Sequence, residues 1–225
     1  MPEVLEQTLP HRAEIFYPGD TEEKAVIYLE QREDDMGETS IHAMVIHRLL
    51  QVLLYFFERR NDIFISPNMN LYYDEDNSNK WFAPDILIAF DVPNNERSSY
   101  QIWKENVSPQ VIFEVSSERT WKIDISEKLE VYSQVGVEEY YILDPEFAYL
   151  PAPILAFHRQ GGRLLTAPVN DDRIFSPRLG LEIVRTDNNF RLFDPQKNEF
   201  LRNLDEAEAE VKRLRSEIES LKANK

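Results

Sequence analysis

Apolar residues recur along the chain with two different periods. Residues 41–59 have the spacing of a helix with one buried face. Residues 124–135 have the same period, and Gly136 is a natural stop for that second helix. Short apolar runs, typical of strands, lie at residues 62–73, 86–90, 109–117 and 138–145, and Pro67 marks a bend or an edge in the first of them. A helix between two apolar strands is the usual crossover, so this order predicts an α/β fold with a sheet flanked by helices.

The C-terminal third of the chain has a different pattern. Residues 153–193 contain short apolar stretches separated by turn signals, among them Gly161-Gly162, which predicts extra strands and a hairpin. In residues 203–225 the apolar side chains are spaced alternately three and four apart: Leu204, Ala207, Val211, Leu214, Ile218 and Leu221. This spacing predicts a coiled-coil helix. A lone helix of this polarity is marginal in water, so we expect it to pair with a second copy, giving a homodimer, or to lie on the body.

Charge divides the chain into three parts. Among 225 residues, 41 are acidic and 25 are basic, a net charge of −16. Residues 1–40 carry 11 acidic and 3 basic side chains, so this acidic segment holds half of the excess. Residues 41–202 carry 24 acidic and 17 basic side chains and form the predicted domain. Residues 203–225 form the predicted coiled coil. Such acidity argues against nucleic-acid binding through a general basic surface.

Several classes of protein lose support from the sequence. The chain has no cysteine, which excludes disulfide scaffolds, thiolate zinc sites and a cysteine nucleophile. The first residues show no signal peptide, and the longest apolar stretch, residues 44–57, is too short and too polar to span a bilayer. We therefore expect a cytoplasmic protein without a membrane partner. Phosphate-binding loops, dinucleotide fingerprints and nucleophile elbows are absent from the sequence.

Two acidic residues stand in otherwise apolar strands. Asp85 follows Pro84 at the start of the run 86–90, and Glu114 lies inside the run 109–117. Side chains alternate along a strand, so Glu114 shares a face with Ser116. A buried carboxylate is costly unless it is paired or binds a metal, and two carboxylates on neighbouring strands suit Mg²⁺ or Mn²⁺. Each residue alone is also compatible with a turn cap or a salt bridge.

The helix after Glu114 carries a lysine near its inner face. Lys128 lies between the apolar positions of that face and four residues after Asp124. It is placed either to point at the two carboxylates, where it could polarise water or a phosphate, or to pair only with Asp124 at i,i+4. The spacing leaves both readings open.

These residues together resemble a known family. The motifs are Pro84-Asp85, then Glu114-Val115-Ser116, then Asp124 with Lys128 and Tyr132, and finally residues 136–141. Over residues 38–145 the chain resembles the Uma-two family of restriction-endonuclease-like proteins, which share the PD-(D/E)XK nuclease fold. The resemblance implies an αβββαβ core with a mixed sheet and a metal site at the strand ends, acting on DNA.

The resemblance also implies roles for particular residues. Asp85 and Glu114 would hold Mg²⁺ or Mn²⁺. Glu38 is either a further acidic ligand or an acid that stabilises the start of the first helix through the helix dipole, which we favour slightly. The standard pattern has a lysine two residues after the second acid, where this chain has Ser116. Lys128 is then the lysine relocated to the following helix, with Asp124 supporting it. His42 on the first helix is a further candidate near Glu38.

Two kinds of function follow. The first is metal-dependent endonuclease hydrolysis of DNA phosphodiester bonds through Asp85, Glu114 and Lys128, with weak or assisted DNA binding because of the acidity. The alternative is a non-catalytic binding or scaffold protein on the same fold, dimerised by its C-terminal helix. The missing strand lysine and the net charge favour this alternative.

Overall fold

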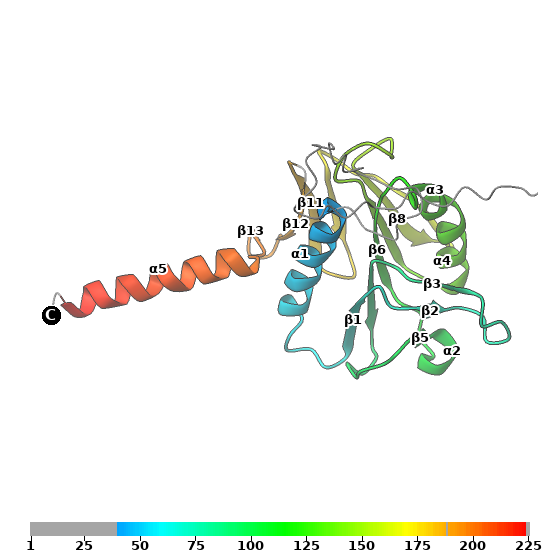
Figure 1. Cartoon of the computed structure of the whole chain (residues 1–225), viewed down its shortest axis with the longest axis horizontal. Coiled ribbons are helices and arrows are strands. Elements are labelled where there is room, and N and C mark those ends of the chain that lie inside the picture. Colours follow the sequence, from blue (N-terminus) through cyan, green and yellow to red (C-terminus); the bar gives the residue numbers. More distant parts are fainter. Residues whose placement is uncertain (1–39, 188, 224–225) are drawn as a thin grey trace, which may run out of the picture. The chain divides into compact units, whose positions relative to one another are not determined.

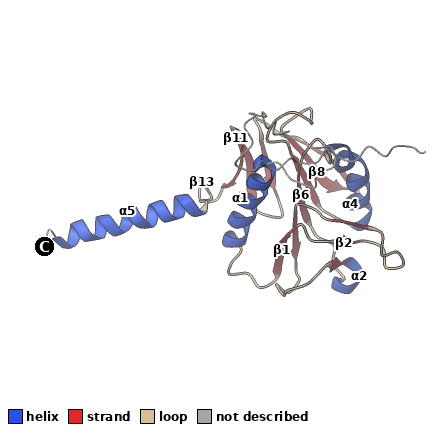
Figure 2. Cartoon of the chain, viewed as in Figure 1, coloured by secondary structure: helices blue, strands red, loops and turns tan. Residues whose placement is uncertain are grey.

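A computed structural model describes residues 40–187 and 189–223 (Figures 1 and 2). The central element is a six-stranded sheet with the order β1-β4-β6-β7-β8-β9. Its strands are β1 Ile63–Pro67, β4 Ile86–Phe90, β6 Val111–Val115, β7 Glu139–Leu143, β8 Ile154–Gln160 and β9 Arg163–Ala167. Strands β6 and β7 are parallel and the other neighbours are antiparallel, so the sheet is mixed, as predicted.

Helices cover both faces of this sheet. Helix α1 (Ser40–Phe56) packs on one face, and Figure 1 shows α4 (Leu129–Val135) on the other. The chain passes from β6 to β7 through α3 (Trp121–Ile123), the π-helical turn η1 (Asp124–Lys128) and α4. This crossover is the one that the sequence order predicts, and the αβββαβ arrangement is confirmed.

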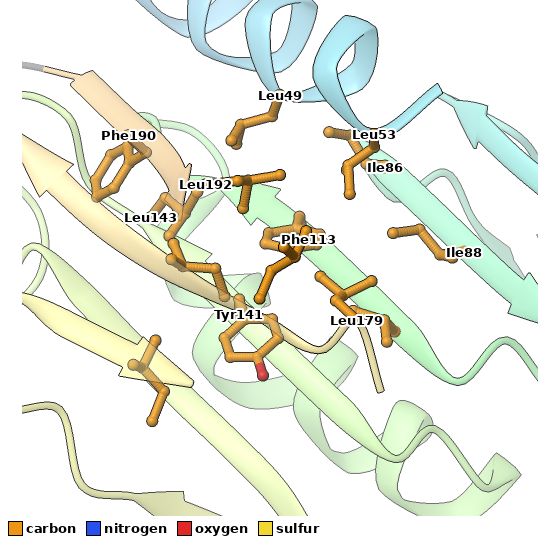
Figure 3. Packing of buried hydrophobic residues seen from close by; sticks show 14 of the residues in the cluster. Leu49, Leu53, Ile86, Ile88, Phe113, Tyr141, Leu143, Leu179, Phe190 and Leu192 are labelled. Carbon is orange, nitrogen blue, oxygen red and sulfur yellow. The ribbon is translucent and has the colours of Figure 1, made fainter. Parts of the chain in front are cut away.

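The core divides into two layers because strand side chains alternate between the faces. Val111, Phe113 and Val115 of β6 pack with Leu49 and Leu53 of α1. Figure 3 shows these leucines directed at Phe113, with side chains of the second sheet beside them. The even-numbered residues of β6 point to the opposite face, toward the crossover helices. Glu114 belongs to this second set, on the face that the sequence predicts.

A second sheet covers the α1 side. It has four antiparallel strands: β10 Arg173–Ser176, β11 Leu181–Thr186, β12 Asn189–Asp194 and β13 Glu199–Phe200. The predicted extra strands are therefore present, and the Gly161-Gly162 hairpin joins β8 to β9, with both glycines at positive φ. Positive φ at two successive positions is the conformation that glycine adopts without steric cost.

Three predicted boundaries differ from the structure. The first helix ends at Phe56 rather than residue 59, because the Arg60 backbone N–H donates to the Phe57 carbonyl in a tight turn. The expected strand 62–73 is two strands, since the chain turns at Asn68, whose φ is 47°. The second of them is β2 (Leu71–Tyr72), in a three-stranded sheet with β3 (Trp81–Phe82) and β5 (Tyr100–Gln101).

Two more helices complete the described chain. Helix α2 (Ile102–Glu105) follows β5, and α5 (Leu204–Ala223) follows β13. The crossover helix begins at Trp121, earlier than predicted, and ends at Gly136, whose φ of 104° forms the left-handed C-cap that the sequence indicates. Within the described residues, none of the helices has the length and apolar character needed to cross a membrane.

Candidate active site

Asp85 and Glu114 lie at the ends of two neighbouring antiparallel strands. Ile86 of β4 pairs with Phe113 of β6, so Asp85 falls beside Glu114 in the register. The Asp85 backbone N–H donates to Glu114 Oε2 at 3.4 Å, and the Val115 backbone N–H donates to Asp85 Oδ2 at 2.6 Å. Both carboxyl groups are buried. Asp85 and Glu114 are 29 residues apart in the sequence, and their carboxyl groups lie together in the interior.

Lys128 reaches this location from the crossover. Its Nζ lies 2.9 Å from Glu114 Oε2 and 2.8 Å from Asp124 Oδ1. The ammonium therefore makes the i,i+4 pair with the helix acid Asp124 and also contacts one of the two strand acids, Glu114. Asp124 and Lys128 are the first and last residues of the π-helical turn η1. Single π turns inside α-helices are often found at functional sites.

Two tyrosines complete the polar contacts around these groups. The Tyr132 hydroxyl donates to Glu114 Oε1 at 3.0 Å, and the Tyr140 hydroxyl donates to the Asp124 backbone carbonyl at 3.0 Å. Each oxygen of Glu114 therefore has its own donor, and the turn that carries Lys128 is tied to β7. Sequence reasoning gave Tyr132 only a place in the motif; its position four residues after Lys128, on the inner face, is the signal that points to this contact.

His42 approaches from α1. Its Nε2 lies 2.8 Å from the Val115 carbonyl oxygen and 3.4 Å from Asp85 Oδ2. The imidazole is buried at the start of the helix. The structure therefore brings His42 to Asp85, while Glu38, its expected neighbour, lies outside the described residues.

Burial and like charge shape the ionisation of the cluster. Burial raises the pKa of Glu114 to about 8, the Lys128 ammonium opposes that shift, and the Asp85 carboxylate adds to it. Burial likewise raises the pKa of Asp124 against the opposing effect of Lys128. Burial alone would lower the pKa of Lys128, but the carboxylates of Glu114 and Asp124 outweigh it, and the net shift is upward. Lys128 is consequently a stable cation at neutral pH.

Ser116 occupies the slot of the usual strand lysine. It is buried, and its backbone N–H donates to the Leu143 carbonyl at 2.7 Å. Its hydroxyl oxygen is buried and has no hydrogen-bond partner within the described part of the chain. A buried hydroxyl usually has a partner, so this group is suited to bind a water or a polar ligand at the site.

The donors at the site suit a small, hard cation. Asp85 and Glu114 supply carboxylate oxygens, while the described residues contain no group of three His, Cys, Asp or Glu arranged for a metal. Mg²⁺ is commonly held by one or two carboxylates and keeps several waters, whereas zinc would need more nitrogen or sulfur ligands. The donor chemistry of the site therefore suits Mg²⁺ or Mn²⁺. The Ser116 hydroxyl, which has no hydrogen-bond partner within the described residues, belongs to the residue two positions after Glu114, on the same face of the sheet.

Comparison with known proteins identifies the family of the chain. The model of the Uma2 family, described as "Putative restriction endonuclease", matches residues 15–187. The chain belongs to this family. The match is wider than residues 38–145, which carry the motifs.

Among solved structures, the chain is similar to a protein from Anabaena variabilis described as a "putative nuclease belonging to DUF820". The identity is 10%, the TM-score is 0.47, and the match covers 63% of this chain and 75% of that one. No curated protein matches the chain.

Proposed function

We propose that this protein is a metal-dependent endonuclease that hydrolyses DNA phosphodiester bonds at the Asp85–Glu114 site. The observation that carries the proposal is the 2.9 Å contact between Lys128 Nζ and Glu114 Oε2. A lysine from the following helix thereby stands beside the strand acid, although the strand slot holds Ser116. Membership of a restriction-endonuclease-like family supports the reaction class.

Asp85 and Glu114 would hold Mg²⁺ or Mn²⁺ through their carboxylate oxygens. The bound cation would lower the pKa of a water and neutralise charge on the phosphate. Fixed donors hold these carboxylates in place before substrate arrives: the Val115 N–H on Asp85 and the Tyr132 hydroxyl on Glu114. Such preorganisation avoids rearrangement during the reaction.

Lys128 would act as a charged donor rather than as a base. Its raised pKa keeps the ammonium protonated, so it can polarise the attacking water or the scissile phosphate. The water oxygen forms the new bond to phosphorus while the bond to the leaving oxygen breaks. The leaving oxygen ends protonated, and the water loses its proton to solvent. No enzyme side chain becomes covalently attached.

The acidity of the chain sets the expected mode of DNA binding. The net charge is −16, and residues 41–202 still carry more acidic than basic side chains. Each phosphate contact from a basic residue strengthens DNA binding, so a domain with few spare cations binds weakly. We therefore propose that DNA is engaged weakly or with assistance.

The second candidate function is a non-catalytic binding or scaffold role on the same fold. Ser116 in the lysine slot and the excess of acidic residues favour it. In either case we propose three parts, an acidic segment 1–40, a nuclease-like domain 41–202 and a helix 203–225 through which the protein forms a homodimer. A dimer offers one site for each strand of a duplex.

Plasmid cleavage tests the proposal. The full-length protein is incubated with supercoiled plasmid in Mg²⁺ or Mn²⁺, beside Asp85→Ala and Lys128→Ala. We expect nicked or linear plasmid from the wild type, loss with either substitution, and loss on addition of EDTA. Lys80→Ala is the matched control, because that lysine also pairs with an aspartate but lies exposed in the Asp74 turn. Cleavage that survives both site substitutions would contradict the site, and no cleavage by the wild type would favour the scaffold role.

A further inference from the structure

Helix α5 begins at a fixed point on the second sheet. Asn203 is its N-cap, since the Glu206 backbone N–H donates to Asn203 Oδ1 at 2.9 Å and the Asn203 N–H donates to Glu206 Oε2 at 3.1 Å. This reciprocal pair is a capping box. Arg191 of β12 adds an ion pair to Glu206 at 2.9 Å. The helix therefore starts immediately after the domain.

The apolar seam of α5 is uncovered in the single chain. Its large apolar residues are between 42% and 63% exposed, namely Leu204, Val211, Leu214, Ile218 and Leu221. Every residue from 211 to 222 is exposed. A helix of this length gains most of its stability from packing an apolar face, so we expect the apolar seam to pack against an apolar partner.

The residue types along the seam indicate two parallel strands. With Leu204 at heptad position a, the a positions also hold Val211 and Ile218, and the d positions hold Ala207, Leu214 and Leu221. Branching at Cβ in a and leucine in d favour the parallel dimer over trimers and tetramers. The second and third heptads follow this rule. The first heptad departs from it, with Leu204 at position a and the smaller Ala207 at position d.

The charges beside the seam agree with the same arrangement. Position g holds Glu210 and Glu217, and position e holds Glu208 in the first heptad, then Arg215 and Lys222. In a parallel pair, g of one helix faces e of the next heptad in the other, so Glu210 meets the partner's Arg215 and Glu217 meets the partner's Lys222. An antiparallel pair would instead bring g against g, where both residues are glutamates, and e against e, where Glu208 is the one acid beside two basic residues. Charge complementarity therefore selects a second copy of this chain in parallel orientation.

We infer that α5 forms a parallel, in-register, two-stranded coiled coil with a second copy of this protein. The inference rests on the self-association proposed above and specifies its order, direction and register. Because α5 starts at the domain, parallel pairing holds both domains at the same end of the coil. Antiparallel pairing would separate the two helix starts by about 30 Å, at 1.5 Å per residue over the helix.

The absence of cysteine makes the direction measurable. Full-length Leu221→Cys is oxidised and its cross-linking is measured. In the inferred coil the two d positions face each other, within the reach of a disulfide, and most of the protein should become a covalent dimer. Ser216→Cys at the outer position f is the matched control and should remain largely uncross-linked. In an antiparallel pair, Leu221→Cys would instead link to Leu204→Cys in a mixture of the two variants.

The mass in solution is measured beside the cross-linking, over a range of concentrations because the seam is short. A wild-type dimer with the Leu221→Cys link supports the inference. The double variant Glu210→Lys with Glu217→Lys should then raise the dimer dissociation constant by about tenfold or more, because attraction becomes repulsion at both g positions.

The contrary outcomes are distinct from one another. A wild-type monomer at every concentration would overturn both self-association and this inference. A trimer or tetramer, or a dimer that links only Leu221→Cys to Leu204→Cys, would overturn the order or direction alone. Plasmid cleavage is scored separately, so none of these results is confused with failure of the nuclease site.

Discussion

Two buried glutamates on adjacent strands have very different surroundings. Glu114 lies near the end of β6 and Glu139 at the start of β7, and the two residues are 2% and 3% exposed. Glu139 pairs with Val111 and Glu114 with Ile142 in the parallel register, so they lie at opposite ends of the strand pair. They also point to opposite faces of the sheet. The sequence context is similar, since each acid adjoins a run of buried apolar residues.

Glu139 is held by neutral donors. The Tyr141 hydroxyl donates to its Oε2 at 2.9 Å, the Arg178 backbone N–H donates to its Oε1 at 2.7 Å, and the Ser176 hydroxyl also donates to Oε2. These groups come from β7, β10 and the turn after β10, so the carboxylate ties the main sheet to the second sheet. Full satisfaction by fixed neutral donors is typical of a structural buried acid.

Glu114 instead lies among other charges. Two further carboxyl groups, Asp85 and Asp124, are close enough to influence its pKa, and Lys128 is the cation that bridges Glu114 to Asp124. Acid in excess of base within a buried cluster is costly for stability and useful for binding a cation. The comparison teaches that two buried acids in similar apolar strands can have opposite surroundings, and the charged surroundings of Glu114 are the reason why we propose it, and not Glu139, as a site residue.

The largest expected difference between Glu114 and Glu139 is in the rate of plasmid cleavage. Glu114→Gln should lower plasmid cleavage by about 1000-fold, because Glu114 is both a proposed metal ligand and the partner of Lys128. Glu139→Gln makes the same chemical change in the other cluster and should leave the cleavage rate of folded protein within about twofold. Equal loss in both variants would contradict the separation of the two roles.

The free energy of unfolding should depend more on Glu139 than on Glu114. Glu139→Ala removes the shared acceptor of the buried Tyr141 and Ser176 hydroxyls and of the Arg178 backbone N–H, and should lower the free energy of unfolding by about 3 kcal/mol. Glu114→Gln should change it by less than about 1 kcal/mol at pH 7, because a costly buried carboxyl group is removed as well as its contacts. Urea unfolding of the two variants beside the wild type measures this, and a larger loss for Glu114→Gln would reverse the assignment.

The raised pKa of Glu114 predicts a pH dependence. The folded protein retains a proton up to about pH 8 that the unfolded chain releases near its ordinary pKa of 4.5. The unfolded state therefore binds fewer protons in this window, and the free energy of unfolding falls as pH rises through it, by at most about 1.4 kcal/mol per pH unit. Urea unfolding from pH 5 to 8 should show this fall in the wild type relative to Glu114→Gln. A difference that is constant with pH would contradict it.

The smallest expected effect concerns the tyrosine that holds Glu114. Tyr132→Phe removes the 3.0 Å hydrogen bond to Glu114 Oε1 and should lower cleavage by about tenfold, equivalent to about 1.4 kcal/mol. Tyr100→Phe is the matched control, since that buried hydroxyl donates to the Val107 carbonyl away from the site. Its cleavage rate should match the wild type, and an equal loss would indicate a general effect on folding.

Much of the fold follows from local pattern. The strand Ile86–Phe90 agrees with its prediction residue for residue, because a run of five apolar residues between polar ones is typical of a fully buried strand. Gly136 ends its helix as predicted, because only glycine adopts that φ without steric cost. The bend beside Pro67 was indicated by the sequence, but the pairing of β2 with β3 and β5 was not, since it joins segments distant in sequence.

The site was predictable in its members and not in its geometry. Asp85, Glu114 and Lys128 stand out as charged residues in apolar contexts, and the structure brings them together. The π turn that carries Lys128 has no periodic signature, because one extra residue in a short helix barely alters the apolar spacing. The ties from Tyr132, Tyr140 and the Val115 N–H depend on strand register, which single-chain spacing does not give.

The most direct measurement is a calorimetric titration of Mn²⁺ into wild type, Glu114→Gln and Glu139→Gln at pH 8. If the cluster at Glu114 is a metal-dependent active site, the wild type and Glu139→Gln bind the ion with the same affinity and Glu114→Gln loses that binding. Equal binding by all three proteins, or no binding by the wild type, would contradict the assignment of the Asp85–Glu114 site.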